Sequence, residues 1–309
     1  MQRIAVCAGV ANQRSLAWKS ALAMLQGNEF DHVIITYQND RFQPSVEKLV
    51  EQQNAIYLKQ FEEEELSNDN RKRNMVPKKI SSLPLNVTDE NEVQSMFEDR
   101  IPTFIQQSQI ESEKELNVEP CIDALVHSVA YAPAEAMKST HDLPLLHTSK
   151  ESFDVSHSTS AYSLITLSRH AAPLLSCEQN SHVDLDNKRS PSITAMTYLG
   201  STRAVPNYNI MGPAKASLES IVRGLAMELS PPPYGIRVNA VSAGPISTLA
   251  ARGIKDFGIM KKGVDDKSMI KRGIHPEEVG NVVAFVAGPR ASGVTGQVWF
   301  VDGGYSSLV

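Results

Sequence analysis

The stretch RIAVCAGVANQRSLAW, residues 3–18, places an apolar strand, a glycine and the start of a helix in direct succession. A glycine at the end of a strand lets the backbone approach a ligand closely, and the helix N-terminus that follows offers unpaired N–H groups to a phosphate. The match to the usual dinucleotide fingerprint is weak, because only Gly9 of its three glycines is present. The stretch predicts one strand–turn–helix unit of a nucleotide-binding fold.

The rest of the chain repeats this alternation of short apolar runs and helical patterns, which favours βαβ units, a parallel sheet and the α/β class. Further helices are expected over about residues 90–107, 149–175 and 208–229. The apolar runs predict strands at residues 3–10, 33–40, 80–87, 121–133, 192–200, 236–246 and 296–305. Parallel strands of an open α/β sheet bind ligands at their carboxyl ends, so we expect the site there.

Three polar stretches interrupt this pattern near residues 59–80, 106–120 and 177–190. We interpret them as solvated, partly disordered insertions in a single domain that spans residues 1–309. The first insertion carries an acidic block followed by a basic one, a pattern that is also compatible with a docking loop.

The composition is that of an ordinary soluble globular protein, with 41% hydrophobic and 21% charged residues. The formal net charge of −5 gives no reason to expect nucleic acid as a partner, and no apolar run reaches the length of about 18 residues that would predict a membrane span. Cys7, Cys121 and Cys177 are far apart in sequence, so we expect neither a metal site nor a redox pair, and a reducing compartment. Because an apolar strand begins by Ile4, we expect a cytoplasmic protein, or one of an organelle matrix or stroma if a transit peptide has been removed.

The stretch SPSITAMTYLGSTRAVPNYNIMGPAK, residues 190–215, holds the residues with the clearest chemistry. If the chain is helical from about Asn207, Tyr208 and Lys215 are just under two turns apart and leave the same face. A fixed ammonium beside a phenol lowers the pKa of the phenol, and its remaining N–H groups can donate to a sugar hydroxyl. Two unrelated surface residues on a helix would show the same spacing. Pro213 is tolerated only near a helix start, so we predict a start or bend within residues 209–212.

Other positions support a nicotinamide cofactor less directly. Gln38, after the second strand, can hydrogen-bond a ribose hydroxyl, and the neighbouring Asp40 would repel a 2′-phosphate. NADH is therefore favoured, while Arg41 keeps NADPH open.

We expect His127 to be a packed histidine and not a catalytic one, because no nucleophile signature accompanies it. Residues 248–260 read equally as a mobile flap over an apolar ligand or as an ordinary amphipathic surface helix.

Six motifs in register cover nearly the whole chain apart from the insertions: GVANQRSLAW, TYQND, HSVAYAP, TYLGSTRAVPNYNIMGPAKASLE, IRVNAVSAGPISTLAARGIKDF and TGQVWFVDGGY. Together they resemble the enoyl-acyl-carrier-protein reductases of the short-chain dehydrogenase/reductase superfamily. The resemblance implies a doubly wound Rossmann-type fold, with a seven-stranded parallel sheet in a three-layer α/β/α sandwich, and a homotetramer.

The resemblance also implies hydride transfer from NADH to the β-carbon of a trans-2-enoyl thioester held on acyl carrier protein, in the last step of the fatty acid elongation cycle. Tyr208 would hydrogen-bond the thioester oxygen as negative charge develops, Lys215 would bind the nicotinamide ribose, and Tyr198 would be an auxiliary donor. The implied cofactor contacts are Gly9, Ser15 and Leu16 at the pyrophosphate, Gln38 at the adenosine ribose, Asn86 and Val87 at the adenine, Val129 along the cofactor, and Ile246 and Thr248 at the nicotinamide. The implied acyl pocket and flap comprise Ala132, Ala250, Ile254, Phe257 and Met260.

Four positions depart from the family pattern. Lys19 replaces a small residue, Asn86 an aspartate, Ala130 a glycine and Ser247 an arginine. Asn86 can still accept a hydrogen bond from the adenine amino group through its carbonyl, and Ser247 removes a charge that bears on affinity more than on chemistry. An acidic carrier protein could meet the lysines near the flap, for which a solvated basic face is the simpler interpretation. These lysines are Lys255, Lys261, Lys262 and Lys267.

Two alternatives stay open beside the enoyl reductase. A carbonyl reductase of the wider superfamily would resemble its relatives in placing a serine thirteen residues before the tyrosine, where this chain has Ala195. A non-catalytic dinucleotide-binding scaffold would keep the fold and acquire insertions, and the intact Tyr208 and Lys215 weigh against it.

Overall fold

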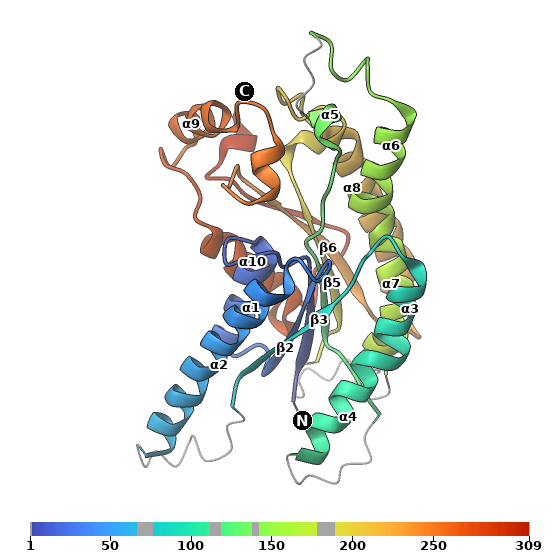
Figure 1. The fold of residues 1–309 in the computed structure, drawn as a ribbon, viewed down its shortest axis with the longest axis vertical. Helices are drawn as coiled ribbons and strands as arrows, with labels where there is room; N and C mark the ends of the chain where they lie inside the picture. Colours follow the sequence, from blue (N-terminus) through green and yellow to red (C-terminus); the bar gives the residue numbers. More distant parts are fainter. Residues whose placement is uncertain (1, 67–76, 112–118, 138–141, 178–188, 309) are drawn as a thin grey trace.

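A computed structural model describes residues 2–66, 77–111, 119–137, 142–177 and 189–308 of the chain. Within these residues a parallel sheet of seven strands forms in the order β3-β2-β1-β4-β5-β6-β7, which confirms the predicted doubly wound fold (Figure 1). The strands are β1 (Ile4–Ala8), β2 (His32–Tyr37), β3 (Lys79–Pro84), β4 (Ala124–His127), β5 (Ser192–Thr197), β6 (Arg237–Ala243) and β7 (Val298–Val301). The strand order reverses between β1 and β4, and this is where such sheets bind ligands.

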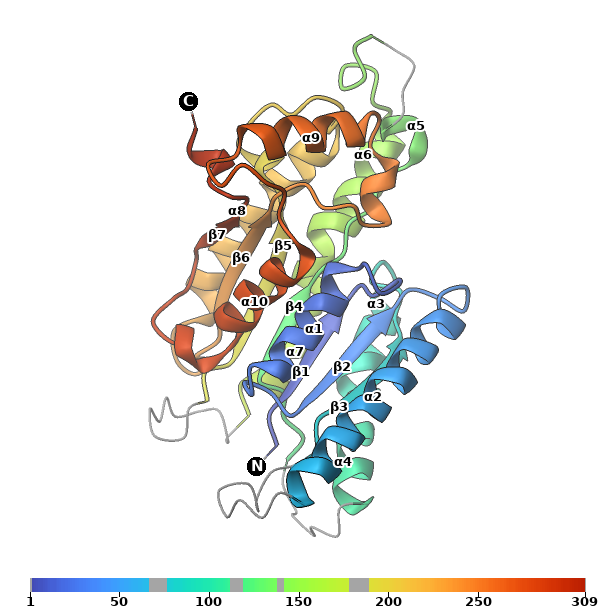
Figure 2. The same cartoon turned by 90° about the vertical axis from the view of Figure 1, so that its left-hand side faces the viewer.

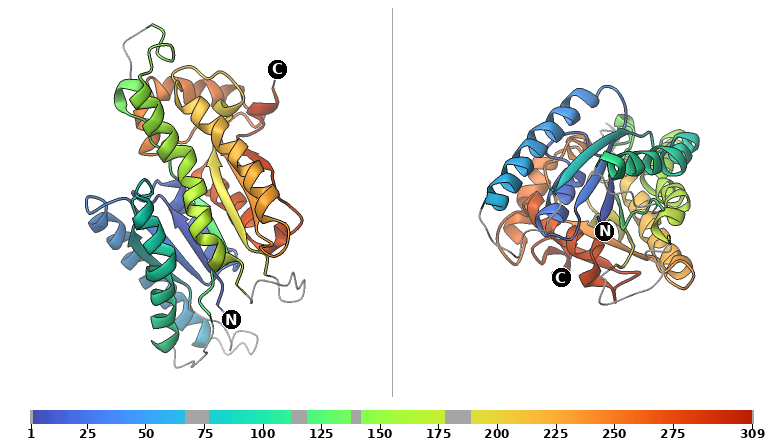
Figure 3. Two further views of the ribbon diagram at one scale, coloured as in Figure 1. Left: turned by 90° about the vertical axis from the view of Figure 1, so that its right-hand side faces the viewer. Right: turned by 90° about the horizontal axis from the view of Figure 1, so that it is seen from below.

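Helices cover both faces of the sheet, which gives the three layers (Figures 2 and 3). One apolar cluster joins one face to α1 (Leu16–Gln26), α2 (Gln43–Leu66) and α10 (Pro276–Ala287). A second cluster joins the other face to α3 (Glu90–Ser95), α4 (Ile101–Glu111), α7 (Ser163–Leu175) and α8 (Met211–Leu229). Because both faces are covered, every residue of β1, β2, β4, β5 and β6 is buried.

Shorter helices lie near the carboxyl edge of the sheet. They are α5 (Ala134–Met137), α6 (Lys150–His157) and α9 (Phe257–Lys267), with the 3₁₀ turns η4 (Leu199–Ser201) and η5 (Ala250–Gly253). The predicted long helix over residues 149–175 is present as α6 and α7, joined through one π-helical turn (Ser158–Tyr162). Among the described residues no helix is both long and apolar enough to cross a membrane.

The polar insertions are shorter than predicted where the structure describes them. Helix α2 continues to Leu66 and helix α4 to Glu111, because a helix needs only one apolar stripe to pack and tolerates a charged outer face. The remaining parts, residues 67–76, 112–118 and 178–188, lie outside the described residues. The single-domain assignment of residues 1–309 stays a prediction. Strand β4 also ends at His127, well before the predicted residue 133.

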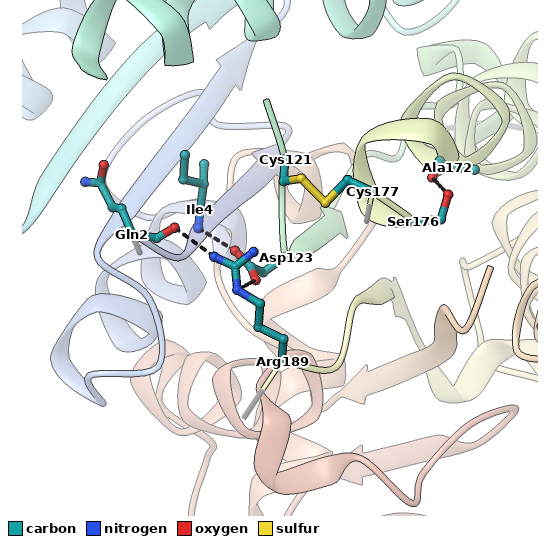
Figure 4. The surroundings of a disulfide bond; sticks show 8 residues. All are labelled: Gln2, Ile4, Cys121, Asp123, Ala172, Ser176, Cys177 and Arg189. Atoms are coloured by element: carbon teal, nitrogen blue, oxygen red, sulfur yellow. Dashed lines mark hydrogen bonds and ion pairs between the residues drawn. A yellow bond between two sulfur atoms is a disulfide. The ribbon is translucent and has the colours of Figure 1, made fainter. Parts of the chain in front are cut away.

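The prediction that the cysteines form no pair is wrong. Cys121 and Cys177 are 56 residues apart in sequence, yet they form a disulfide with a Cα–Cα distance of 6.0 Å (Figure 4). The entry to β4 and the end of α7 lie side by side, where the Ile122 N–H donates to the Leu174 carbonyl at 3.0 Å. Spacing along the sequence cannot reveal this pairing, because packing of α7 on the sheet creates it. Cys7 is free and buried, and burial raises the pKa of its thiol.

Candidate active site

A cavity of about 530 Å³ opens at the carboxyl edge of the sheet, and every residue predicted for the site lines it. The nucleotide-side residues come from the ends of β1, β2, β3 and β4, and the others come from β5, α8, the loop after β6 and the segment over the cavity. The predicted residues are Gly9, Ser15, Leu16, Gln38, Asn86, Val87, Val129, Ala132, Tyr198, Tyr208, Lys215, Ile246, Thr248, Ala250, Ile254, Phe257 and Met260. Their individual roles stay proposals.

The turn after β1 has the shape of a phosphate cradle although it lacks two fingerprint glycines. Gly9 has a φ of +104°, and a Cβ there would lie within 2.9 Å of the Ser128 carbonyl carbon and closer still to its oxygen. The Ser15 Oγ accepts hydrogen bonds from the Ala11 and Asn12 N–H groups at 3.0 and 3.1 Å and, within the described chain, does not cap α1. The first-turn N–H groups of α1 are thus available to an anion, so these residues fit a dinucleotide pyrophosphate.

The residues predicted to bind the adenosine part of the cofactor line the cavity, but one predicted hydrogen bond is not supported. Gln38 lines the cavity, whereas neither Asp40 nor Arg41 is among the described residues that line it. The Asn86 Oδ1 already accepts from the Thr88 N–H at 3.2 Å and from the Thr88 Oγ1 at 2.8 Å. Because an amide oxygen has two lone pairs, the predicted hydrogen bond from adenine to this oxygen is not supported.

Tyr208 lies immediately before helix α8 and not on it. The helix begins at Met211, which confirms the start predicted from Pro213 and makes the assumption of a helix from Asn207 wrong. Asn207 and Asn209 flank Tyr208 with φ values of 61° and 37°, in the left-handed region that asparagine tolerates. Their side-chain amides donate to the Lys255 and Ala136 carbonyls, both at 3.0 Å. Sequence reasoning missed these two anchors, although the Asn-Tyr-Asn triplet before a helix start is a usable signal.

Burial dominates the acid–base behaviour of the two central residues. It raises the pKa of Tyr208, with smaller contributions in the same direction from Tyr198 and Glu219. Burial also lowers the pKa of Lys215 to about 8, partly opposed by Glu219. The prediction that the lysine lowers the phenol's pKa is therefore wrong, because desolvation disfavours both charged forms. At neutral pH the cavity holds a protonated phenol and an ammonium.

The two tyrosines are packed against each other. Their ring centroids are 4.7 Å apart in an edge-to-face arrangement. Gly200 makes room for this pair, since a Cβ there would lie within 2.7 Å of the Tyr208 Cε1. Burial, followed by the charges of Tyr305 and Asp302, raises the pKa of Tyr198 to about 12, so this phenol is also a neutral donor.

The segment over the cavity is both a surface helix and part of the cavity wall. We call residues 249–267, which include η5 and α9, the flap. Its Ile254, Phe257 and Met260 line the cavity, while Ile259 on the outer side is 77% exposed. The Met260 Sδ lies 4.0 Å from the Tyr198 hydroxyl, which places the flap directly against the catalytic candidates. Lys261 pairs with Asp265 within α9.

His127 is a packed histidine, as predicted. Its side chain is buried, and its Nε2 lies 2.8 Å from the Ser163 Oγ. The Ser163 hydroxyl donates to the Thr159 carbonyl, so the histidine is the donor. Burial, helped by the Lys215 charge, lowers the pKa of His127 to about 3 and keeps the ring neutral.

The positions that depart from the family pattern fall in two places. Ala130 and Asn86 line the first cavity. Lys19 and Ser247 line a second cavity of about 720 Å³, which shares Ile246 with the first. The Lys19 ammonium pairs with Glu277 at 2.9 Å there.

Comparison with known proteins agrees with this geometry. The family model described as enoyl-(acyl carrier protein) reductase matches residues 55–306. The chain is 34% identical to the NADH-dependent enoyl-acyl-carrier-protein reductase of Salmonella typhimurium, over 96% of this chain and 92% of that one. It is 44% identical to the Neisseria meningitidis enzyme of the same name, over 60% of this chain and 65% of that one.

The fold comparison points the same way. The Bacillus cereus enoyl-acyl carrier protein reductase, solved with NADP+ and indole naphthyridinone, matches with a TM-score of 0.75 and 32% identity. The match covers 99% of this chain and 97% of that one. The chain belongs to the enoyl-(acyl carrier protein) reductase family.

Proposed function

We propose that this protein is an enoyl-acyl-carrier-protein reductase that uses NADH to reduce the double bond of a trans-2-enoyl thioester, the last step of fatty acid elongation. The observation that carries the proposal is one cavity that joins a phosphate cradle at Gly9 to a buried phenol, Tyr208, and a buried ammonium, Lys215. When bound, NADH supplies the hydride that adds to the β-carbon of the substrate.

Tyr208 stabilises the charge that develops on the thioester oxygen. Its raised pKa keeps the hydroxyl protonated, so it can donate a hydrogen bond to that oxygen as the enolate forms. Desolvation by the surrounding apolar side chains strengthens this bond relative to one in water. Tyr198 is the auxiliary donor, because its ring packs on Tyr208 and the residue also lines the cavity. Solvent water then gives a proton to the α-carbon of the enolate, which completes the saturated thioester and leaves hydroxide to the buffer.

Lys215 holds the nicotinamide ribose and keeps the cavity positive. Its Nζ donates one hydrogen bond to the Met196 carbonyl at 2.8 Å, which leaves two donors for sugar hydroxyls. The cofactor is held by the cradle at Gly9, Ser15 and Leu16, and by Gln38 at the ribose. We expect the remaining cofactor contacts at Asn86, Val87, Val129, Ile246 and Thr248, and the acyl contacts at Ala132, Ala250, Ile254, Phe257 and Met260.

Two features favour this reaction over the alternatives. Ala195 is fully buried within β5 and carries no hydroxyl, so the chain lacks there the donor that a carbonyl reductase would use. The buried Tyr208 and Lys215 are costly to keep in a non-catalytic scaffold, since desolvation opposes burial of an ammonium. NADH is favoured over NADPH because the residues between β2 and α2 that line the cavity, Gln38 and Phe42, carry no positive charge for a 2′-phosphate.

We further propose a homotetramer that works on substrate carried by acyl carrier protein, in the cytoplasm, with no nucleic acid partner. Large apolar side chains exposed on neighbouring helices support self-association: Phe153 on α6 and Met227 on α8 are among them.

One assay separates the candidates. Purified protein is mixed with NADH or NADPH and with a trans-2-enoyl, a 3-ketoacyl or no thioester, and oxidation of the cofactor is followed. We expect turnover with NADH and the enoyl thioester. Turnover of the ketoacyl thioester alone would instead indicate a carbonyl reductase, and cofactor binding without any turnover would indicate a scaffold.

A further inference from the structure

A buried carboxylate, Glu219, lies beside the site and has no part in the mechanism above. It occupies helix α8 four residues after Lys215, so the two side chains share one face of the helix. Only 5% of Glu219 is exposed, as is 5% of Lys215. A buried charged residue is rare unless it is paired, so the position calls for a physical reason.

Glu219 and Lys215 tie the same end of β5 to α8. The Thr197 Oγ1 donates to the Glu219 Oε1 at 2.7 Å, and the Lys215 Nζ donates to the carbonyl of the preceding residue, Met196, at 2.8 Å. Tyr198 follows directly in the chain. The carboxylate is thus fixed by the strand that delivers the first tyrosine and by the helix that carries the lysine.

We propose that Glu219 is a positioning residue, which holds Lys215 in its ammonium form and orients it through the shared anchor on β5. The proposal rests on the function proposed above, in which Lys215 binds the cofactor ribose. Glu219 lines no part of the described cavity and acts through Lys215, not on the substrate.

The other titratable groups around Lys215 are neutral at physiological pH. His127 on β4 has a pKa of about 3, and burial raises the pKa values of Tyr198, near η4, and of Tyr208, before α8. Among these groups around Lys215, the negative charge therefore comes from Glu219. Its charge opposes the desolvation that lowers the pKa of Lys215 to about 8. Without the carboxylate, the ammonium would be lost at a lower pH.

The direct test is an NMR titration of the Lys215 side chain in the full-length protein without substrate. In the variant Glu219→Gln, which preserves size and an acceptor for Thr197, we expect the Lys215 midpoint to fall by about one pH unit. Glu219→Asp should restore most of the difference. The control Glu228→Gln removes an exposed carboxylate from the same helix, and we expect no shift from it. An unchanged Lys215 midpoint in Glu219→Gln would overturn the proposal.

A second readout needs no variant and covers the case in which Glu219→Gln does not fold. In the wild type, the carboxyl carbon of Glu219 should report the same midpoint as Lys215, because each group senses the other's charge. If the chemical shift of the Glu219 carboxyl carbon did not change as Lys215 titrates, the proposal would be contradicted. The carboxylate would then be only a structural link to Thr197. Because neither titration uses substrate, failure here is distinct from a failure of enoyl reduction in the turnover assay.

Discussion

The floor of the cavity and its flap are built in opposite ways. The floor, which we define as Tyr198, Tyr208 and Lys215, is buried and fixed: Tyr208 is 8% exposed, and Lys215 is bonded to β5. The flap presents Phe257 and Met260 to the cavity while Ile259 faces outward and is 77% exposed. We propose that this difference reflects a division of work, in which the floor sets the geometry of the reaction and the flap admits the acyl chain.

A matched pair of glycine substitutions tests this difference most sharply. Gly200→Ala, beside the floor, would push the Tyr208 ring, and we expect kcat to fall about 100-fold, as a displacement of about 1 Å at a reacting group can cause. Gly258→Ala in the flap introduces a Cβ that meets no described atom within 4 Å, so kcat should stay within about twofold. Steady-state kinetics on both variants, with circular dichroism to verify folding, provides the measurement. Equal losses in the two would show that floor and flap are not distinct.

Acid should destabilise the protein through the buried His127 on β4. The pKa of His127 is lowered from its ordinary value of 6.5 to about 3, so the unfolded chain binds more protons between these values. The stability that this neutral histidine contributes is complete above pH 6.5 and is lost as pH falls towards 3. At about pH 4.5 we expect a loss of roughly 2–3 kcal/mol.

Denaturant unfolding as a function of pH measures this loss. The variant His127→Gln should show a flatter pH dependence than the wild type, whereas His147→Gln, at an exposed histidine, should retain the full slope. Parallel curves for wild type and His127→Gln would contradict the proposed burial of a neutral ring.

The flap should affect substrate length more than chemistry. Phe257→Ala removes an apolar wall of the cavity, and we expect the KM for a long-chain enoyl thioester to rise about tenfold. The KM for a four-carbon substrate and both kcat values should stay within about twofold, because the floor is untouched. Kinetics with a series of chain lengths decides the matter, and a fall in kcat for the shortest substrate would place Phe257 in the floor.

Much of the fold and the membership of the site could be predicted from the sequence, because both depend on local patterns. Buried parallel strands read as apolar runs, and their carboxyl ends meet at one edge of the sheet, so Gly9, Gln38 and Tyr198 converge without any knowledge of side-chain packing. Pro213 likewise located the start of α8, because its ring excludes it from a helix interior.

Two of the predictions that failed depend on contacts between residues that are distant in sequence, and a third failed because of a local turn. The pKa of Tyr208 follows from burial, which the Tyr–Lys spacing does not encode. The Cys121–Cys177 pair exists because α7 returns to the entry of β4. The Asn86 carbonyl is occupied by a turn with Thr88, a local feature that the sequence contained and that the comparison with an aspartate obscured.

Deuteride transfer in a single turnover examines the role of Tyr208 most directly. Enzyme saturated with NADH deuterated at the transferred position is mixed with a trans-2-enoyl thioester, and the product is analysed by mass spectrometry and NMR for wild type and Tyr208→Phe. We expect one deuterium on the β-carbon, and a rate in the variant that is about 100- to 1,000-fold lower with NADH affinity unchanged, since one donor to the developing oxyanion is lost. Equal rates in the two proteins, or no deuterium on the β-carbon, would contradict the assignment of Tyr208 as the group that stabilises the enolate.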